Sequence, residues 1–381
     1  MNVEAVVKSR YSVAAQAREA SLCCPVDYNR KYLEIIPREV IDKDYGCGDP
    51  SQHVREGETV LDLGSGAGKI CFIAAQVVGP KGRVIGVDMN DDMLDMARRH
   101  QKTVGDALGY HNVEFRKGRI QDLALDLAKL EEDLREQPIQ CAESFLAAEA
   151  RAEDLRVSHP LVRDESIDVV VSNCVLNLVD HVSREKLFRE ILRVLKRGGR
   201  AVISDIVSDE EVPLAMQNDP KLWSGCISGA LTEEGFLQAF EDAGFYGIRL
   251  VKWNDAPWQT VNGIEFRSIT VEAYKGTQEP RFEHRHAVIY KGPFKAVLDD
   301  EGHRLARGVR HAVSDQIFQQ LKKEPYRDHF IFVDPREPVA PGTAEVFDSA
   351  RATRRHPRET KGLEFKATSD PSQCCDGTGC C

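Results

Sequence analysis

Four cysteines stand at positions in the sequence where thiol chemistry could take place. Cys174 follows the apolar run IDVVV directly, and Cys71 lies two residues beyond the glycine-rich stretch DLGSGAGK. Cys226 falls within LWSGCISGAL, and Cys47 falls within YGCGDPS. Thiolates act as nucleophiles and as ligands for soft metals and metalloids. The spacing of these four residues contains no close C-x₂-C pairs, so it does not indicate a structural zinc site.

The composition narrows the class of protein. The chain has 381 residues with 42% hydrophobic and 29% charged residues, as is ordinary for a soluble globular protein. Its net charge of -10 argues against non-specific nucleic-acid binding, which depends on neutralising phosphates. No apolar run of membrane length and no signal-peptide pattern is present. We therefore expect a cytoplasmic monomer with reduced thiols, and the odd number of 11 cysteines excludes complete disulfide pairing.

Strands and helices alternate through the first two thirds of the chain. An apolar strand at 60–63 precedes the glycine-rich turn, and a helix is predicted over 69–78 before Gly79-Pro80. A second helix is predicted over 90–103, with Asn90 as its N-cap. Further strands are predicted in NVEFRKG, IDVVVSN, RAVISDIV, YGIRLVKW and EFRSITVEAYKG. This order predicts an α/β fold with a doubly wound, mostly parallel, seven-stranded sheet.

Changes in composition suggest domain boundaries. Residues 1–58 are expected to form a lid segment, and residues 59–280 the main domain, with a charged helical hairpin inserted at about 123–164. Residues 281–337 predict a small C-terminal α+β domain with strands near 287–290, 294–298 and 330–333. Residues 338–381 are rich in Pro, Arg, Thr and Ser and end in CCDGTGCC, so we expect a disordered tail.

The glycine-rich loop points to a positively charged ligand. A dinucleotide fingerprint would place a glycine where Lys69 stands, and Asp62 ahead of the first glycine would repel a pyrophosphate. S-adenosylmethionine carries both an ammonium and a sulfonium group, which suit that carboxylate. Asp88, at the end of the second strand, is placed to hold ribose hydroxyls. A nucleotide-binding loop and a turn without a ligand are the alternatives.

The D-x-G-x-G-x-G loop together with the acid ending the second strand resembles motif I of the class I S-adenosylmethionine methyltransferases. The resemblance implies a set of loop and strand-end residues that bind the cofactor: Asp62, Gly64, Ser65, Gly66, Gly68 and Asp88. It also implies that Met89, Ile120 and Gln121 surround the adenine. Asn173 and Cys174 would then face the methionine portion.

The four cysteines belong to the edge of the sheet where ligands bind. In open α/β sheets this edge lies beyond the carboxyl ends of the strands, here between the first and fourth strands. Cys71 is in the first turn of the helix after the first strand, where the helix N-terminus would lower the pKa of its thiol. Three thiolates beside a methyl donor form a soft-ligand site. Trivalent arsenic suits such a site, because it binds three sulfurs and keeps a lone pair that can accept a methyl group.

The segments YGCGDP, DLGSGAGKICF, SNCVLNL and WSGCISGAL together resemble the cysteine segments of arsenite S-adenosylmethionine methyltransferases, and in particular their microbial branch. The resemblance covers about residues 20–340. It implies that Cys71, Cys174 and Cys226 hold As(III). It further implies that Cys47 cycles through a disulfide with Cys71. The implied reaction converts arsenite to methyl- and dimethylarsenicals, with glutathione or thioredoxin as thiol reductant and without a structural metal.

Two other functions stay open on the residues alone. A methyltransferase of an organic molecule such as a quinone or sterol would need a base near the pocket. A non-catalytic arsenic-sequestering protein would not need the cofactor loop. Among the other cysteines, Cys23 and Cys24 are expected to pack in the lid and Cys141 to be incidental. The tail cysteines could capture arsenic on a flexible tether: Cys374, Cys375, Cys380 and Cys381.

Overall fold

The structure is a computed structural model that describes residues 2–22, 26–276, 281–300, 302–348 and 354–362. The chain divides into two compact units, Met1–Gly276 and Thr277–Cys381. The predictions for Cys23, Cys24 and the four tail cysteines concern residues outside these described ranges. None of the described helices combines the length and the apolar character that a membrane span requires.

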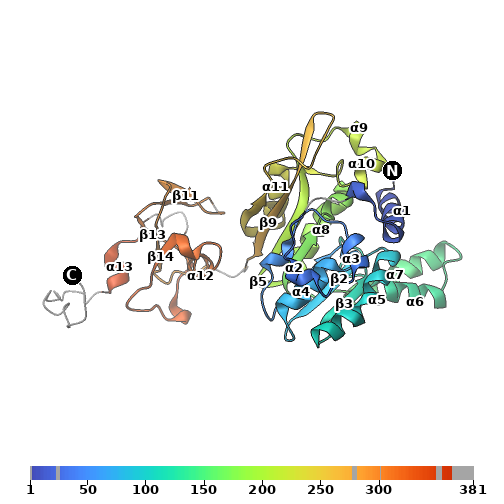
Figure 1. Cartoon of the computed structure of the whole chain (residues 1–381). Coiled ribbons are helices and arrows are strands. Elements are labelled where there is room, and N and C mark those ends of the chain that lie inside the picture. Colours follow the sequence, from blue (N-terminus) through green and yellow to red (C-terminus); the bar gives the residue numbers. More distant parts are fainter. Residues whose placement is uncertain (1, 23–25, 277–280, 301, 349–353, 363–381) are drawn as a thin grey trace. The chain divides into compact units, whose positions relative to one another are not determined.

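The first unit is built on one central sheet, which Figure 1 shows between layers of helices. Its main strands run in the order β3-β2-β1-β4-β5-β9-β7. Their bounds are β1 Thr59–Leu63, β2 Arg83–Asp88, β3 Val113–Lys117, β4 Ile167–Asn173, β5 Leu195–Ser208, β7 Phe245–Trp253 and β9 Ile264–Lys275. Strands β1 to β5 pair in parallel, and β9 is antiparallel to β5 and β7. The predicted doubly wound, mostly parallel sheet is confirmed. Two short strands, β6 Leu231–Thr232 and β8 Gln259–Val261, pair with β5 and β9.

Helices cover the sheet on both faces and bury two separate cores. Helices α4 (Lys69–Val78) and α5 (Asp91–Leu108) pack on one face, where Phe72 and Met93 are buried. Helices α8 (His181–Val194) and α11 (Glu233–Ala243) contribute to the core on the other face. The Asn90 side chain accepts a hydrogen bond from the Met93 amide, which is the predicted N-cap of α5.

The segment before β1 forms a cover over the carboxyl edge of the sheet. It contains α1 (Val3–Gln16), η1 (Ala20–Leu22), α2 (Arg30–Leu33), α3 (Arg38–Asp42) and η2 (Pro50–His53). On the same side lie η3 (Leu176–Leu178), α9 (Leu214–Gln217) and α10 (Pro220–Trp223). The Arg10 guanidinium of α1 donates hydrogen bonds to the Lys221 carbonyl at 2.8 Å and to the Ser224 hydroxyl at 3.1 Å. These bonds hold α1 against the loop that carries Cys226.

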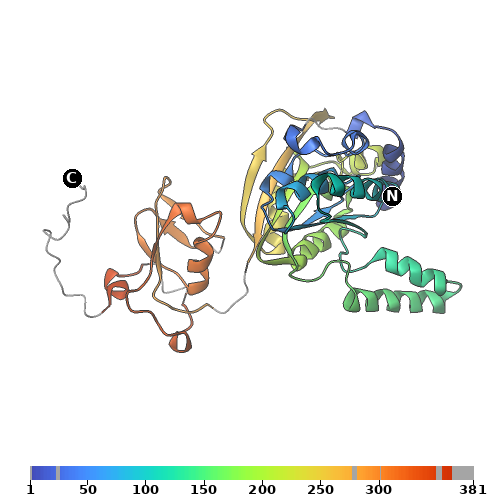
Figure 2. The ribbon, with the colours of Figure 1, turned by 60° about the horizontal axis from the view of Figure 1, so that its bottom comes forward.

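The insertion between β3 and β4 is a helical hairpin of α6 (Leu127–Glu136) and α7 (Ala142–Ser158). Figure 2 shows the pair, in green, standing away from the sheet. The Arg151–Asp133 ion pair, at 2.7 Å, links the two helices, and Arg156 ties α7 to Asp122 at 2.9 Å. The hairpin therefore lies outside the edge of the sheet where the cysteines gather.

The second unit contains a three-stranded sheet of β13 (Arg310–Ala312), β10 (Ala287–Tyr290) and β14 (Phe330–Val333). A two-stranded ribbon, β11 (Ala296–Leu298) and β12 (Arg304–Ala306), and the helix α12 (Asp315–Leu321) complete it, with η4 (Arg327–His329) and η5 (Pro341–Thr343).

The described chain continues in this unit beyond residue 337, where a disordered tail was expected. Helix α13 (Pro357–Lys361) follows Arg355, which is 7% exposed and pairs with Glu283 at 2.7 Å. The Arg310 guanidinium donates to the Thr360 hydroxyl at 2.8 Å. Polar contacts between residues far apart in the sequence hold this segment. The polar composition of the segment, read alone, does not reveal these contacts.

Candidate active site

The glycine-rich loop and the end of β2 form one wall of a pocket. Gly64, Gly66 and Gly68 have φ values of 68°, 51° and 90°, which favour glycine. The Gly66 amide donates to one Asp88 carboxylate oxygen at 2.9 Å, and the Asn90 amide donates to the other at 2.8 Å. The carboxylate predicted to hold ribose therefore also fixes the loop beside it.

The pocket brings together most of the residues predicted to bind the cofactor. Gly64, Gly66, Asp88, Met89, Ile120, Gln121 and Cys174 line it. The cover closes it from the other side with Glu4, Lys8, Tyr11, Asp44 and Tyr45. The Gln121 amide donates to Glu4 at 3.0 Å, so α1 reaches the predicted adenine end. Asp44 pairs at 3.0 Å with Lys69, the residue that replaces the fingerprint glycine.

Four predicted cofactor residues do not line this pocket. Asp62 is buried within β1, Ser65 is buried within the loop, and Gly68 caps α4. The Asn173 side chain does not face the pocket, because its oxygen accepts from the amides of Cys47 and Gly48, each at 2.9 Å. Its nitrogen donates to the Gly48 carbonyl at 2.8 Å. Asn173 thus holds the cover in place, and its expected contact with the methionine portion stays a prediction.

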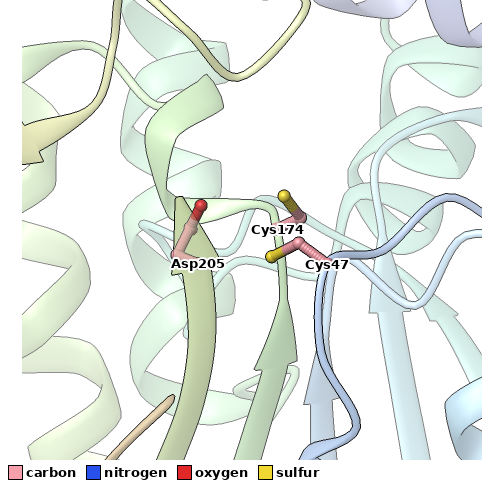
Figure 3. A group of neighbouring side chains, drawn as sticks. All are labelled: Cys47, Cys174 and Asp205. Carbon is pink, nitrogen blue, oxygen red and sulfur yellow. The ribbon is translucent and has the colours of Figure 1, made fainter. Parts of the chain in front are cut away.

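Two of the predicted thiols meet a carboxylate at the edge of the sheet. The ligand atoms of Cys47, Cys174 and Asp205 all lie within 4.8 Å of one another, and all three residues are buried. Figure 3 shows that they come from the cover, from the turn after β4 and from β5. Burial is the main cause that raises the pKa of Asp205, to about 6.

Two glycines allow Cys47 to reach this position. A Cβ atom on Gly46 would lie 2.2 Å from the Asn173 amide nitrogen, and a Cβ on Gly48 would lie 2.5 Å from Ser204. The sequence YGCGDPS therefore places Cys47 on a backbone that passes tightly over the ends of β4 and β5.

Cys226 adjoins this cluster. Its thiol donates a hydrogen bond to the Cys174 carbonyl at 3.3 Å, and the two residues share an apolar cluster with Cys47. The Tyr11 side chain of α1 lies beside the Cys226 thiol. Burial, together with the nearby thiols of Cys226 and Cys174, raises the pKa of Tyr11 well above its ordinary value, so this hydroxyl stays protonated.

Cys71 occupies a different environment from the other three. Its thiol donates to the Asp62 carboxylate at 3.2 Å, and its side chain packs in the core beneath α4. The expectation of a lowered thiol pKa is wrong, because burial and the Asp62 charge raise the pKa of Cys71. Burial also raises the pKa of Asp62, to about 8. As it stands, the structure places Cys71 with Asp62 and Cys47 with Cys174.

Asp205 and Tyr11 were missed on the sequence. Asp205 follows the same rule as Cys174, since it lies near the carboxyl end of β5, where ligands of such sheets bind. Attention to every polar residue at a strand end would have found it. No local signal marks Tyr11, which reaches the site only because α1 folds back over the sheet.

The fold, the glycine-rich loop and the strand-two acid define a class I S-adenosylmethionine-dependent methyltransferase. A methyltransferase-domain family matches residues 55–244, and a domain family of unknown function matches residues 277–365. An arsenite methyltransferase of Aquipseudomonas alcaligenes is 30% identical over 83% of this chain and 85% of its own length. The arsenite methyltransferase of Mus musculus is 29% identical over 93% of this chain and 87% of its own length.

Among solved structures, an arsenic(III) S-adenosylmethionine methyltransferase from Chlamydomonas reinhardtii is similar with a TM-score of 0.54 and 27% identity. The similarity covers 85% of this chain and 100% of that one. The chain belongs to the arsenite methyltransferase family.

Proposed function

We propose that the chain transfers methyl groups from S-adenosylmethionine to trivalent arsenic, converting arsenite to methyl- and dimethylarsenicals in arsenic detoxification. One observation carries the proposal. Cys174 lines the cofactor pocket and also lies within 4.8 Å of the Cys47 thiol, while Cys226 touches its backbone. Soft thiol ligands therefore adjoin the place where a methyl donor would bind.

Arsenic would be the nucleophile through its lone pair, so the reaction needs no general base. S-adenosylmethionine supplies an electrophilic methyl group on its sulfonium. Cys174 and Cys226 would hold the arsenic, and Cys47 lies close enough to act as a further thiol ligand. Burial of these cysteines would keep water away from the site, and the As–S bonds would set the direction of the lone pair, which is catalysis by proximity.

We infer a second role for Cys71 and Cys47. Attack of the lone pair on a methyl group leaves arsenic oxidised by two electrons. Two thiols can return these electrons by forming a disulfide, which glutathione or thioredoxin then reduces. Cys71 would serve as a partner of Cys47 in that disulfide or as a third arsenic ligand, and either role requires its thiol to leave Asp62. We further propose that the enzyme acts as a cytoplasmic monomer.

A single assay tests the proposed reaction. The protein is incubated with methyl-labelled S-adenosylmethionine, arsenite and either glutathione or thioredoxin, and the labelled products are identified by chromatography. Methyl- and dimethylarsenicals are expected. A folded protein that binds the cofactor but forms no methylarsenical would refute the proposal. Parallel reactions with a quinone and a sterol test the organic-acceptor alternative.

A further inference from the structure

A carboxylate stands beside the thiols where arsenic would bind. The Asp205 side chain completes the buried group formed with Cys47 and Cys174 (Figure 3). The Cys226 thiol is turned toward the Cys174 carbonyl at 3.3 Å. The arrangement that arsenic would meet on entry thus contains two sulfur ligands and one oxygen.

The backbone fixes the Asp205 carboxylate and leaves it with accepting capacity. One oxygen accepts the Leu176 amide at 2.9 Å, and the other accepts the amide of Ile206 at 2.8 Å. A carboxylate offers about four acceptor positions, so further hydrogen bonds can be accepted beside the thiols. The bond to Leu176 also ties Asp205 to the turn that carries Cys174.

Arsenite bound by two thiols would offer the Asp205 carboxylate a hydrogen-bond donor. Arsenite, As(OH)₃, exchanges a hydroxyl for a thiolate, and the thiol proton leaves with that hydroxyl as water. Two exchanges, with Cys47 and Cys174, form two As–S bonds, release two waters and leave one hydroxyl on arsenic. That hydroxyl is a hydrogen-bond donor in a buried site, where a donor without a partner is costly.

We propose that Cys47 and Cys174 capture arsenite first, and that its remaining hydroxyl donates a hydrogen bond to Asp205 until Cys226 replaces it. The proposal rests on the proposed function and deepens it. Methylarsenite keeps no hydroxyl once two thiols have bound, so Asp205 favours arsenite specifically. Asp205 is thereby a residue that determines acceptor specificity in the first methylation.

The test uses the full chain with Cys226→Ser, which removes the thiol that would displace the hydroxyl. Arsenic X-ray absorption on the arsenite-loaded variant is expected to show two sulfurs and one oxygen, and methylarsenite should show two sulfurs and one carbon. Adding Asp205→Asn should weaken arsenite binding roughly tenfold or more, on the scale of a charge-assisted hydrogen bond. Methylarsenite affinity should stay unchanged.

Asn177→Ser in the same Cys226→Ser chain is the matched control. The Asn177 side chain donates to the Ile206 carbonyl, so its loss loosens the same turn, while the backbone amides that bond the Asp205 carboxylate are kept. This control should alter both affinities equally. Equal losses with Asp205→Asn would overturn the proposal, because Asp205 would then only shape the turn.

If the variant with both Cys226→Ser and Asp205→Asn does not fold, the Cys226→Ser chain alone still tests the proposed hydrogen bond to Asp205. A folded Cys226→Ser chain that binds no arsenite, or that shows no oxygen in the arsenic shell, would also overturn the proposal. The formation of methylarsenicals by the wild-type protein is measured separately. Absence of these products would refute the proposed reaction and would leave the binding results unaffected.

Discussion

The thiol of Cys226 points at the backbone of Cys174, with 3.3 Å between the sulfur and the carbonyl oxygen. Both cysteines have positive φ values, 61° at Cys226 and 66° at Cys174. Side chains rarely adopt this conformation, and such strain persists where the surroundings impose it. The loops after β4 and β5 therefore hold two thiols together at a cost in backbone strain.

Replacing either of these two cysteines by serine should abolish methylation of both arsenite and methylarsenite, because a hydroxyl is a poor ligand for a soft centre. Cys47→Ser and Cys71→Ser should retain activity on methylarsenite, which has one valence filled by carbon and needs only two sulfurs. Product analysis with each acceptor checks this. A Cys174→Ser enzyme that methylates methylarsenite at the wild-type rate would contradict the assignment.

Gly48→Ala should displace Cys47 from the cluster, since the added methyl would lie 2.5 Å from Ser204. We expect arsenite affinity to fall at least tenfold while the fold is retained. Fluorescence titration with arsenite measures the loss. Gly342→Ala, where an added Cβ meets nothing within 4 Å, is the matched control. Unchanged arsenite affinity in Gly48→Ala would show that Cys47 takes no part in capture.

Asp88→Ala should weaken S-adenosylmethionine binding by about 1.5–3 kcal/mol, the scale of hydrogen bonds to charged groups. Part of this loss of affinity should come from loosening of the glycine-rich loop, because the Asp88 carboxylate accepts a hydrogen bond from the Gly66 amide. Calorimetry with the cofactor provides the measurement. Asp92→Ala removes an exposed acid from the first turn of α5, the helix that follows β2, and should bind the cofactor normally. Equal affinities of the two variants would reject this placement of the cofactor.

Asp62→Asn should change how stability depends on pH in the ligand-free protein. The pKa of Asp62 is raised from its ordinary value of 3.8 to about 8, so its stabilising proton is fully present below 3.8 and lost as the pH rises through 8. Between these values the free energy of unfolding should fall in the wild type relative to the variant, by up to about 1.4 kcal/mol per pH unit. Urea denaturation of both proteins at pH 5 and pH 7.5 measures the gap. A gap that does not change with pH would show that Asp62 is ionised throughout.

A chain ending at residue 362 should keep the stability of the second unit, whereas a chain ending at 337 should lose part of it. The shorter chain lacks Arg355 and leaves Glu283 and Arg310 without their described partners. Removing one member of a buried ion pair leaves a costly charge behind. Calorimetric melting of the two truncations gives the comparison. Equal transitions for the second unit would contradict this account of the segment.

Helix and strand positions could be predicted from the sequence, because neighbouring residues mark where these elements begin and end. The helix over 69–78 was placed at its observed bounds because a glycine-rich turn precedes it and Gly79-Pro80 follows it. The strand order placed Cys174 and Cys226 at one edge of the sheet. The direction of the Cys71 side chain was not predictable in this way, since a position in the first helical turn does not reveal that the thiol turns inward to Asp62. The bonds of Asn173 to Cys47 and Gly48 join segments about 125 residues apart, and no local pattern encodes them.

Helix α1 touches both ends of the site, since Glu4 accepts a hydrogen bond from Gln121 and Tyr11 lies beside Cys226. One element would therefore close over the spent cofactor and over the arsenical at once. We expect α1 to lift when the cofactor is exchanged after a methyl transfer, which would expose the arsenical as well. We expect the ratio of mono- to dimethylated product to depend on three rates: release of the spent cofactor, release of the arsenical and binding of a new S-adenosylmethionine. Higher concentrations of S-adenosylmethionine should therefore favour transfer of the second methyl group.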